Sequence, residues 1–206
     1  IVSSEKITVI TLNKIFRQAA QSKIIINSHK VNEGNSFLTG EKNEELLEDF
    51  FFIAEKSQDK VLENVISLSN GRLQKYGNYD FFNNIQVISP TKMGILGTKE
   101  LNKYLQEAIN PPTENKKERK WMDTIFREGD RIMQIKNSYD IYWEKHEPNL
   151  EMGKGVFNGE YGTISNIDEN EKRVKIKFDD DKIVWYAFEE LEQIKNLYNK
   201  EAHYYK

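Results

Sequence analysis

The sequence predicts a mixed fold, an α/β domain with a parallel sheet followed by a small β-barrel. Over about the first 110 residues, apolar runs of strand length alternate with segments of helical periodicity. A charged loop at residues 113–120 ("TENKKERK") ends this half, and beyond it the apolar residues recur with a period of two. We therefore expect the α/β domain over residues 1–126, the barrel over 127–190 and a helical tail over 191–206.

The first half is expected to alternate three strands with three helices. The segment "DFFFIA" is a continuous apolar run, which is typical of a strand buried on both faces of a parallel sheet. Ser57 is expected to cap the helix after it, and Asn70-Gly71 to end that helix. The order β-α-β-α-β-α with helix-length crossovers indicates a parallel sheet covered by helices. The expected strands are residues 7–12, 49–54 and 84–89. The expected helices run from residue 19 to about 33, from the Ser57 cap to Asn70-Gly71, and from Thr98 to Pro111-Pro112.

The second half shows short strands separated by Gly, Asn and Asp turns. In "RVKIKF", Val174, Ile176 and Phe178 share one face, as expected for a half-buried strand. Four or five strands within about 60 residues indicate a small barrel. The expected strands are residues 130–135, 162–167, 173–178 and 183–187, with a helical stretch from Glu189 to about Lys200 after them.

Composition narrows the class of protein. The chain has no cysteine, which removes disulfides and thiolate metal sites and fits a reducing compartment, so we expect a cytoplasmic protein. Its longest apolar runs are too short to span a bilayer, and we expect no membrane partner. The net charge of -3 gives no global attraction to phosphate, so nucleic-acid binding has to come from local patches.

Two polar clusters follow strands of the predicted parallel sheet. Arg17 and Gln18 come after the first strand, and Ser89, Thr91 and Lys92 come after the third. Ligands of open α/β sheets bind beyond the carboxyl ends of the strands, so both clusters should share one edge of the sheet. An arginine there suits a phosphoryl group. The alternative is a solvated Arg17 with Gln18 capping a helix, and a capped helix at Thr98 for the second cluster.

The predicted barrel carries a mixture of cations, amides and aromatic rings. Arg131, Lys136, Asn137 and Tyr139 supply the phosphate contacts and stacking faces that a single strand of nucleic acid needs. For the aromatic residues the alternative is core packing, and for Asn158-Gly159 it is a tight hairpin turn. Residues 179–181 ("DDD") are better explained as a solvated turn than as a metal site, and no metal site is expected.

Several blocks resemble the RecD/TraA-type DNA helicases of superfamily 1, motors that move 5′ to 3′. They occur in the family's order and cover most of residues 7–190. The longest blocks are "TLNKIFRQAAQSKIIINSHKVNEG", "DFFFI", "QVISPTKMGILGTKELNKYLQEAINPP", "FREGDRIMQIKNSYDI" and "GVFNGEYGTI". The resemblance implies an incomplete RecA-like three-layer domain, the second of two motor domains, with a small Src-homology-type β-barrel inserted in it.

The resemblance also implies roles for individual residues. "IFRQ" looks like the motif whose arginine reaches the ATP γ-phosphate across the cleft, a role that would fall on Arg17 with Gln18 beside it. "SPTK" looks like a segment that holds the DNA backbone. The implied single-stranded DNA contacts are Ser89, Thr91, Lys92, Asn102, Arg131, Lys136, Asn137, Tyr139 and Asn158.

The sequence also departs from the family. The phosphate-binding loop and the magnesium motif would lie upstream of Ile1, and "NLYNKEAHYYK" replaces the motifs that follow the barrel. ATP and Mg²⁺ are therefore expected in a parent protein, with none bound tightly to this chain. The expected partners are single-stranded DNA and a missing first motor domain of the same chain.

An incomplete parallel sheet should leave one strand edge open. The expected outcomes are self-association through that edge, coverage of the edge by the tail, or marginal stability. Two other functions remain open, an autonomous binder of single-stranded nucleic acid and a protein-interaction module.

Overall fold

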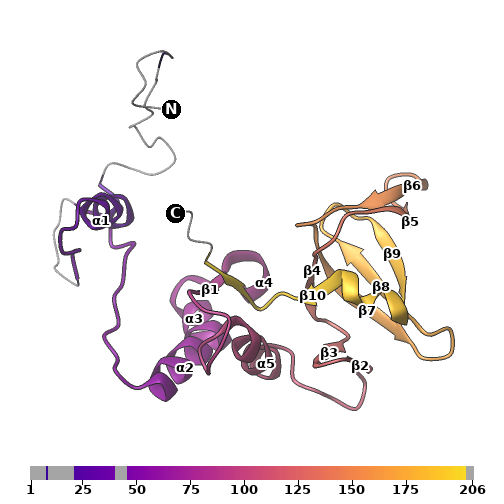
Figure 1. The fold of residues 1–206 in the computed structure, drawn as a ribbon, viewed down its shortest axis with the longest axis horizontal. Coiled ribbons are helices and arrows are strands. Elements are labelled where there is room, and N and C mark those ends of the chain that lie inside the picture. The colour runs from indigo at the N-terminus through magenta and orange to yellow at the C-terminus, as the bar shows by residue number, and fades with distance from the viewer. Residues whose placement is uncertain (1–7, 9–20, 40–45, 203–206) are drawn as a thin grey trace. The chain divides into compact units, whose positions relative to one another are not determined.

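The computed structural model describes residue 8 and residues 21–39 and 46–202. The chain divides into two compact units, residues 1–54 and 55–206, which are considered separately (Figure 1). This division does not test the predicted domain boundaries at 126/127 and 190/191, which stay predictions. Within the described residues, no helix has the length and apolar composition that crossing a bilayer requires.

The first unit is organised around the amino end of helix α1 (Lys23–Asn32). Ser22 caps the helix, and its hydroxyl donates to Asp49 Oδ2 at 2.5 Å. The other oxygen of Asp49 accepts from the backbone N–H of Lys23 at 2.9 Å. The helix predicted over residues 19–33 is therefore present, with its first turn fixed by a carboxylate 26 residues away.

The predicted strand "DFFFIA" is wrong. Residues 50–54 adopt no strand, and Phe51, Phe52 and Ile53 expose 64%, 52% and 52% of their surfaces. A doubly buried strand needs a neighbour on each side, and among the described residues no strand pairs with this segment. Most of the strand predicted at residues 7–12 lies outside the described residues.

The second unit begins with helices that pack around α5. The helix capped by Ser57 is confirmed, but it is broken at Asn70-Gly71, where Gly71 has a φ of +118°, and then resumes. In the helix predicted to begin at Thr98, Leu101 and Leu105 are buried and pack with Leu62 and Phe81. The helical elements are α2 (Gln58–Ser67), η2 (Leu68–Arg72), α3 (Leu73–Gly77), α4 (Phe81–Asn84) and α5 (Thr98–Ile109).

The parallel sheet has only two strands within the described part of the chain, and no RecA-like three-layer domain is recognisable there. Strand β1 (Val87–Ser89) occupies the end of the predicted third strand. It pairs in parallel with β11 (Asn199–Glu201), which lies in the predicted helical tail (Figure 1). The helical prediction for the tail is therefore wrong, and the tail instead covers an edge of β1.

A seven-stranded antiparallel sheet forms most of the rest of the second unit. Its strand order is β10-β4-β7-β8-β9-β5-β6. The predicted alternation in "RVKIKF" is confirmed, with Val174, Ile176 and Phe178 buried in the core. The helix predicted from Glu189 is a short 3₁₀ helix, η3 (Phe188–Gln193), followed by a strand. The sheet contains β4 (Arg131–Gln134), β5 (Ser138–Lys145), β6 (Glu151–Val156), β7 (Tyr161–Asp168), β8 (Arg173–Phe178), β9 (Ile183–Ala187) and β10 (Ile194–Asn196). A separate hairpin contains β2 (Glu118–Trp121) and β3 (Thr124–Arg127).

A buried carboxylate joins this sheet to the helices. Asp130, just before β4, accepts hydrogen bonds at both oxygens. Oδ2 accepts from Gln106 Nε2 at 2.6 Å and from the Arg127 N–H at 2.7 Å. Oδ1 accepts from Asn110 Nδ2 at 2.8 Å and from the Tyr198 hydroxyl at 2.7 Å. Burial raises the pKa of the Asp130 carboxyl, and these hydrogen bonds oppose that shift.

The segment between β10 and β11 is held by α5. The side-chain oxygen of Asn102 accepts from the N–H groups of Tyr198 and Asn199, at 2.9 and 3.1 Å. Asn199 Nδ2 in turn donates to the carbonyl oxygen of Thr98 at 2.9 Å. The ring of Tyr198 stacks on Phe81 with centroids 5.9 Å apart. The chain leaving the seven-stranded sheet is therefore anchored on α5 and α4 before it reaches β1.

Replacing Asp130 with Asn should lower the free energy of unfolding by about 2–3 kcal/mol at pH 7, because the new NH₂ group would face buried donors. Urea unfolding followed by circular dichroism measures this change. Asp123→Asn is the matched control, since Asp123 has 79% of its side chain exposed and should lose less than about 0.5 kcal/mol. Equal losses in the two variants would show that Asp130 does not hold the junction.

Candidate nucleic-acid interface

Four lysines surround one cavity in the second unit. Lys92, Lys99, Lys195 and Lys200 line a hollow of about 600 Å³ that is also lined by Tyr161. We call this cavity and its four lysines the lysine groove. Its only carboxylate among the lining residues is Glu201. A net positive concavity of this kind suits a phosphate backbone.

The four lysines come from separate elements that the tail brings together. Lys92 lies in the loop after β1, and Lys99 lies in the first turn of α5. Lys195 lies in β10 and Lys200 in β11. Because β11 is fixed by Asn102 and by pairing with β1, the groove exists only when the tail is docked.

The loop that carries Lys92 is shaped by Ser89. The buried Ser89 hydroxyl donates to the carbonyl oxygen of Leu96 at 2.6 Å and can also reach that of Thr91 at 3.1 Å. The Thr91 hydroxyl donates to the Met93 carbonyl oxygen at 3.0 Å. Both hydroxyls therefore stabilise the loop in this structure, and the predicted contacts of Ser89 and Thr91 with DNA stay predictions.

The charges in the groove are only weakly neutralised. Lys92 lies 3.4 Å from Glu201, and Lys99 lies 2.8 Å from the exposed carboxylate of Asp123. Burial lowers the pKa of the Lys195 ammonium, the carboxylate of Glu201 opposes this, and the charges of Lys200 and Lys92 lower it further. The lysines are thus close enough to repel one another, which an incoming polyanion would relieve.

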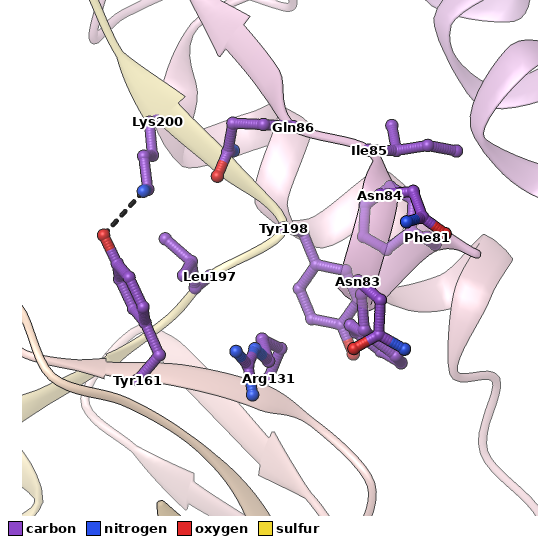
Figure 2. Close-up of a pocket in the computed structure, with 11 residues that line it drawn as sticks. Phe81, Asn83, Asn84, Ile85, Gln86, Arg131, Tyr161, Leu197, Tyr198 and Lys200 are labelled. Carbon is purple, nitrogen blue, oxygen red and sulfur yellow. Dashed lines mark hydrogen bonds between the residues drawn. The ribbon is translucent and has the colours of Figure 1, made fainter. Parts of the chain in front are cut away.

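Tyr161 lies between the groove and a second, smaller hollow. Its hydroxyl is 2.7 Å from Lys200 Nζ, and the guanidinium of Arg131 lies 5.9 Å from its ring centroid. The second hollow has a volume of about 210 Å³ and is lined by α4 on one side and by Arg131 and Tyr161 on the other (Figure 2). Arg131 also makes a bidentate ion pair with Asp179.

The remaining candidate residues form a separate group near the turn between β6 and β7. Asn137 Oδ1 accepts from the Asn158 N–H at 2.9 Å, and Gly159 has a φ of +93° in a turn. The flanking strands β6 and β7 do not pair with each other, so a turn is present but the predicted hairpin is wrong. Tyr139 is 68% exposed and packs edge-on against Phe157, so it is not a core residue. Lys136 pairs with Glu192 at 2.7 Å.

The structure therefore divides the predicted DNA contacts into two groups. Lys92 and Asn102 line the lysine groove, and Arg131 lines the adjacent hollow. Lys136, Asn137, Tyr139 and Asn158 belong to the turn group. Arg17 and Gln18 lie outside the described residues, so their predicted role stays a prediction.

No group of three or more potential metal ligands occurs within the part of the chain that the structure describes. In the acidic turn at residues 179–181, Asp179 pairs with Arg131, and Asp181 lies 3.0 Å from Lys177. Asp180 lies 3.3 Å from Lys182. Each of these carboxylates thus lies next to a lysine or arginine side chain.

Sequence reasoning missed Lys99, Lys195, Lys200 and Tyr161. Lys195 and Lys200 fall in the stretch predicted to be helical, where their joint position beside α5 has no local signal. Tyr161 is the first residue of β7 and was not distinguished from other barrel aromatics. Lys99 directly follows Thr98, where a helix was predicted to begin. That position was the one local signal that could have pointed to Lys99 as a site residue.

Replacing Glu201 with Gln should lower the pKa of Lys195 further, because the Glu201 carboxylate is the main charge that opposes its downward shift. A ¹³C NMR titration of the lysine side chains measures the change. Asp123→Asn is the control, because Asp123 pairs with Lys99 and does not act on Lys195. An unchanged Lys195 pKa in Glu201→Gln would contradict the arrangement of charges in the groove.

Comparison with known protein families identifies the region from α5 to β8. Residues 101–178 match the family described as ATP-dependent RecD-like DNA helicase SH3 domain. The match includes most of α5 and the chain around Asp130 at the start of β4, which meet at the buried carboxylate. It also includes most of the seven-stranded sheet. Residues 101–178 are therefore an SH3-like domain of ATP-dependent RecD-like DNA helicases.

Proposed function

We propose that this chain binds single-stranded DNA through the lysine groove, as part of an ATP-dependent 5′-to-3′ helicase of the RecD-like class. The lysine groove is the observation that carries the proposal. The chain is acidic overall, with a net charge of -3, so a local concentration of four lysines around one cavity is a specific feature. The SH3-like domain of RecD-like DNA helicases supports the choice of DNA as the polyanion.

The groove chemistry fits phosphate contact without base recognition. Lysine ammonium groups act as flexible point charges, and each phosphate that they neutralise releases condensed counterions. The pairs Lys92–Glu201 and Lys99–Asp123 are partly exposed, so exchanging their carboxylates for phosphates costs little. Tyr161 adds an aromatic ring beside the groove, which can stack on a base.

We propose further that ATP acts in the parent helicase through Arg17. There Arg17, with Gln18 beside it, would stabilise the γ-phosphate held together with Mg²⁺ by a first motor domain. This role rests on the resemblance of "IFRQ" to the helicase motif. Movement between the two motor domains would then advance the strand along the lysine groove.

The alternative is an autonomous binder that uses the turn group. The exposed Tyr139 ring and its neighbour Phe157 offer stacking faces on the sheet, and neither ring belongs to the tail. The two proposals differ in which residues control affinity, so substitutions distinguish them.

The double substitution Lys195→Gln/Lys200→Gln should weaken binding of a 12-nucleotide oligothymidylate by about tenfold at low salt. It should also reduce the slope of log affinity against log salt by about 1.4, because each lost phosphate contact on a single strand contributes about 0.7. Fluorescence anisotropy over a series of salt concentrations measures both quantities.

Lys60→Gln/Lys75→Gln is the matched control, with the same change in net charge at two exposed positions on α2 and α3. It should leave the salt slope unchanged. Equal effects in both double variants would show that the groove lysines act on binding only through the net charge of the protein. Loss of binding in Tyr139→Ala, with normal binding in the lysine double variant, would favour the autonomous binder.

The purified chain should not hydrolyse ATP, because its sequence contains no GxxxxGK[ST] loop to hold the phosphates. A phosphate-release assay with and without oligonucleotide checks this. Hydrolysis above background that Arg17→Ala abolishes would overturn the proposed division of labour with a first motor domain.

A further inference from the structure

We propose that the hollow beside Tyr161 is a pocket for one nucleobase of the strand in the lysine groove. The inference rests on the proposed function and deepens it, since it adds a base contact to a site so far described through phosphates. We call this hollow the base pocket. Its lining includes Phe81, Phe82, Asn83, Gln86, Tyr161 and Tyr198.

The size of the base pocket suits a single ring system. Its volume is about 210 Å³. A cavity of about 150 Å³ holds a benzene molecule, whereas pockets for drug-sized ligands begin at about 300 Å³. The base pocket is therefore large enough for one nucleobase and too small for a whole nucleotide with its sugar and phosphate.

The walls of the base pocket are aromatic and rigid. Phe81 and Tyr198 are buried and stack on each other, and Phe82 packs on both with centroids 5.5 and 5.9 Å away. Tyr198 is also held by Asp130 and Asn102, so its ring is fixed in place. Preorganised aromatic faces of this kind bind bases by stacking, whatever the sequence.

The rim of the base pocket is polar, with Asn83 on α4 and Gln86 directly before β1 (Figure 2). Asn83 Nδ2 donates to Asp80, and Gln86 Nε2 donates to the carbonyl oxygen of Val87. Within residues 46–202, no donor meets the side-chain oxygen of Asn83 or of Gln86. These two exposed oxygens can accept hydrogen bonds from the amino and imino groups of a base.

The base pocket and the lysine groove share two lining residues. Tyr161 and Lys200 line both cavities, and the Tyr161 hydroxyl meets Lys200 Nζ at 2.7 Å. A strand whose phosphates follow the lysines would therefore pass the mouth of the base pocket at Tyr161. One base can turn into the pocket there while its phosphate remains on the groove side.

The experiment measures what a single base adds to binding. Two 10-nucleotide strands are compared by fluorescence anisotropy, one entirely abasic and one identical except for a single central thymine. The single thymine should increase the affinity of the unmodified protein by about tenfold, as expected for one stacked base. The strand with the thymine can slide along the lysine groove, so its single base can reach the base pocket whichever phosphates bind first.

Two substitutions locate the gain in the base pocket. Phe82→Ala should abolish it, and Asn83→Ala, at an exposed position, should reduce it by about threefold through loss of one hydrogen bond. Asn170→Ala, in the exposed turn between β7 and β8, is the matched control and should retain the full gain. All three variants should keep the salt slope of the unmodified protein, because the lysines are unchanged.

A further arm adds free thymidine monophosphate. If the base pocket accepts a base only as part of the strand, the mononucleotide at millimolar concentration leaves the tenfold gain intact. Loss of the gain would mean that the pocket accepts a whole nucleotide, which would overturn its assignment as a pocket for one base of the strand.

The outcomes separate this inference from the proposed function. No gain from the thymine, with a normal salt slope, would overturn the base pocket and leave the lysine groove standing. A gain that survives Phe82→Ala and Asn83→Ala but is lost in Tyr139→Ala would place the base contact in the turn group and also overturn the inference. Failure of both strands to bind would overturn the base pocket together with the proposed function.

Discussion

The carboxylate of Asp130 is the interaction on which the second unit depends. It is buried, and its four donors come from α5 and its C-cap residue, from the last residue of β3 and from the segment after β10. A buried carboxylate is costly unless its lone pairs are satisfied, so these three segments have to meet in one arrangement. Arg127 beside it is similarly buried and pairs with Glu107. The helices and the seven-stranded sheet are thus joined by a polar network with little freedom to slide.

Docking of the tail follows from that constraint. Once the Tyr198 hydroxyl reaches Asp130, the next residues run along α5, where Asn102 accepts two of their N–H groups. The strand β11 then pairs with β1 and covers an edge that would otherwise be open. Lys195 precedes the anchored Tyr198 in the sequence and Lys200 follows it. Both side chains line the cavity that Lys92 and Lys99 also line. The fold therefore concentrates positive charge around one cavity, although the net charge of the chain is negative.

The sequence predicted the elements whose signal is local. The apolar spacing in α5, the alternation in β8 and the Asn158-Gly159 turn all depend on near neighbours along the chain, and all three are present. The tail failed as a prediction because residues 194–201 become strands only through pairing with β4 and β1, more than 50 residues away. The segment "DFFFIA" failed for the converse reason, since its apolar run implies neighbours that the described residues do not supply. The candidate site combines both cases, with Lys92 found from the motif and Lys195 and Lys200 found only from the fold.

The most direct test of this account is to find where a bound strand touches the protein. Photo-crosslinking with an oligonucleotide that carries 5-iododeoxyuridine, followed by mass spectrometry of the digested complex, identifies the contacted residues. The account predicts adducts on Tyr161 and on the peptide that contains Lys195, Tyr198 and Lys200. Adducts confined to Tyr139 and Phe157, with none at the lysine groove, would contradict it.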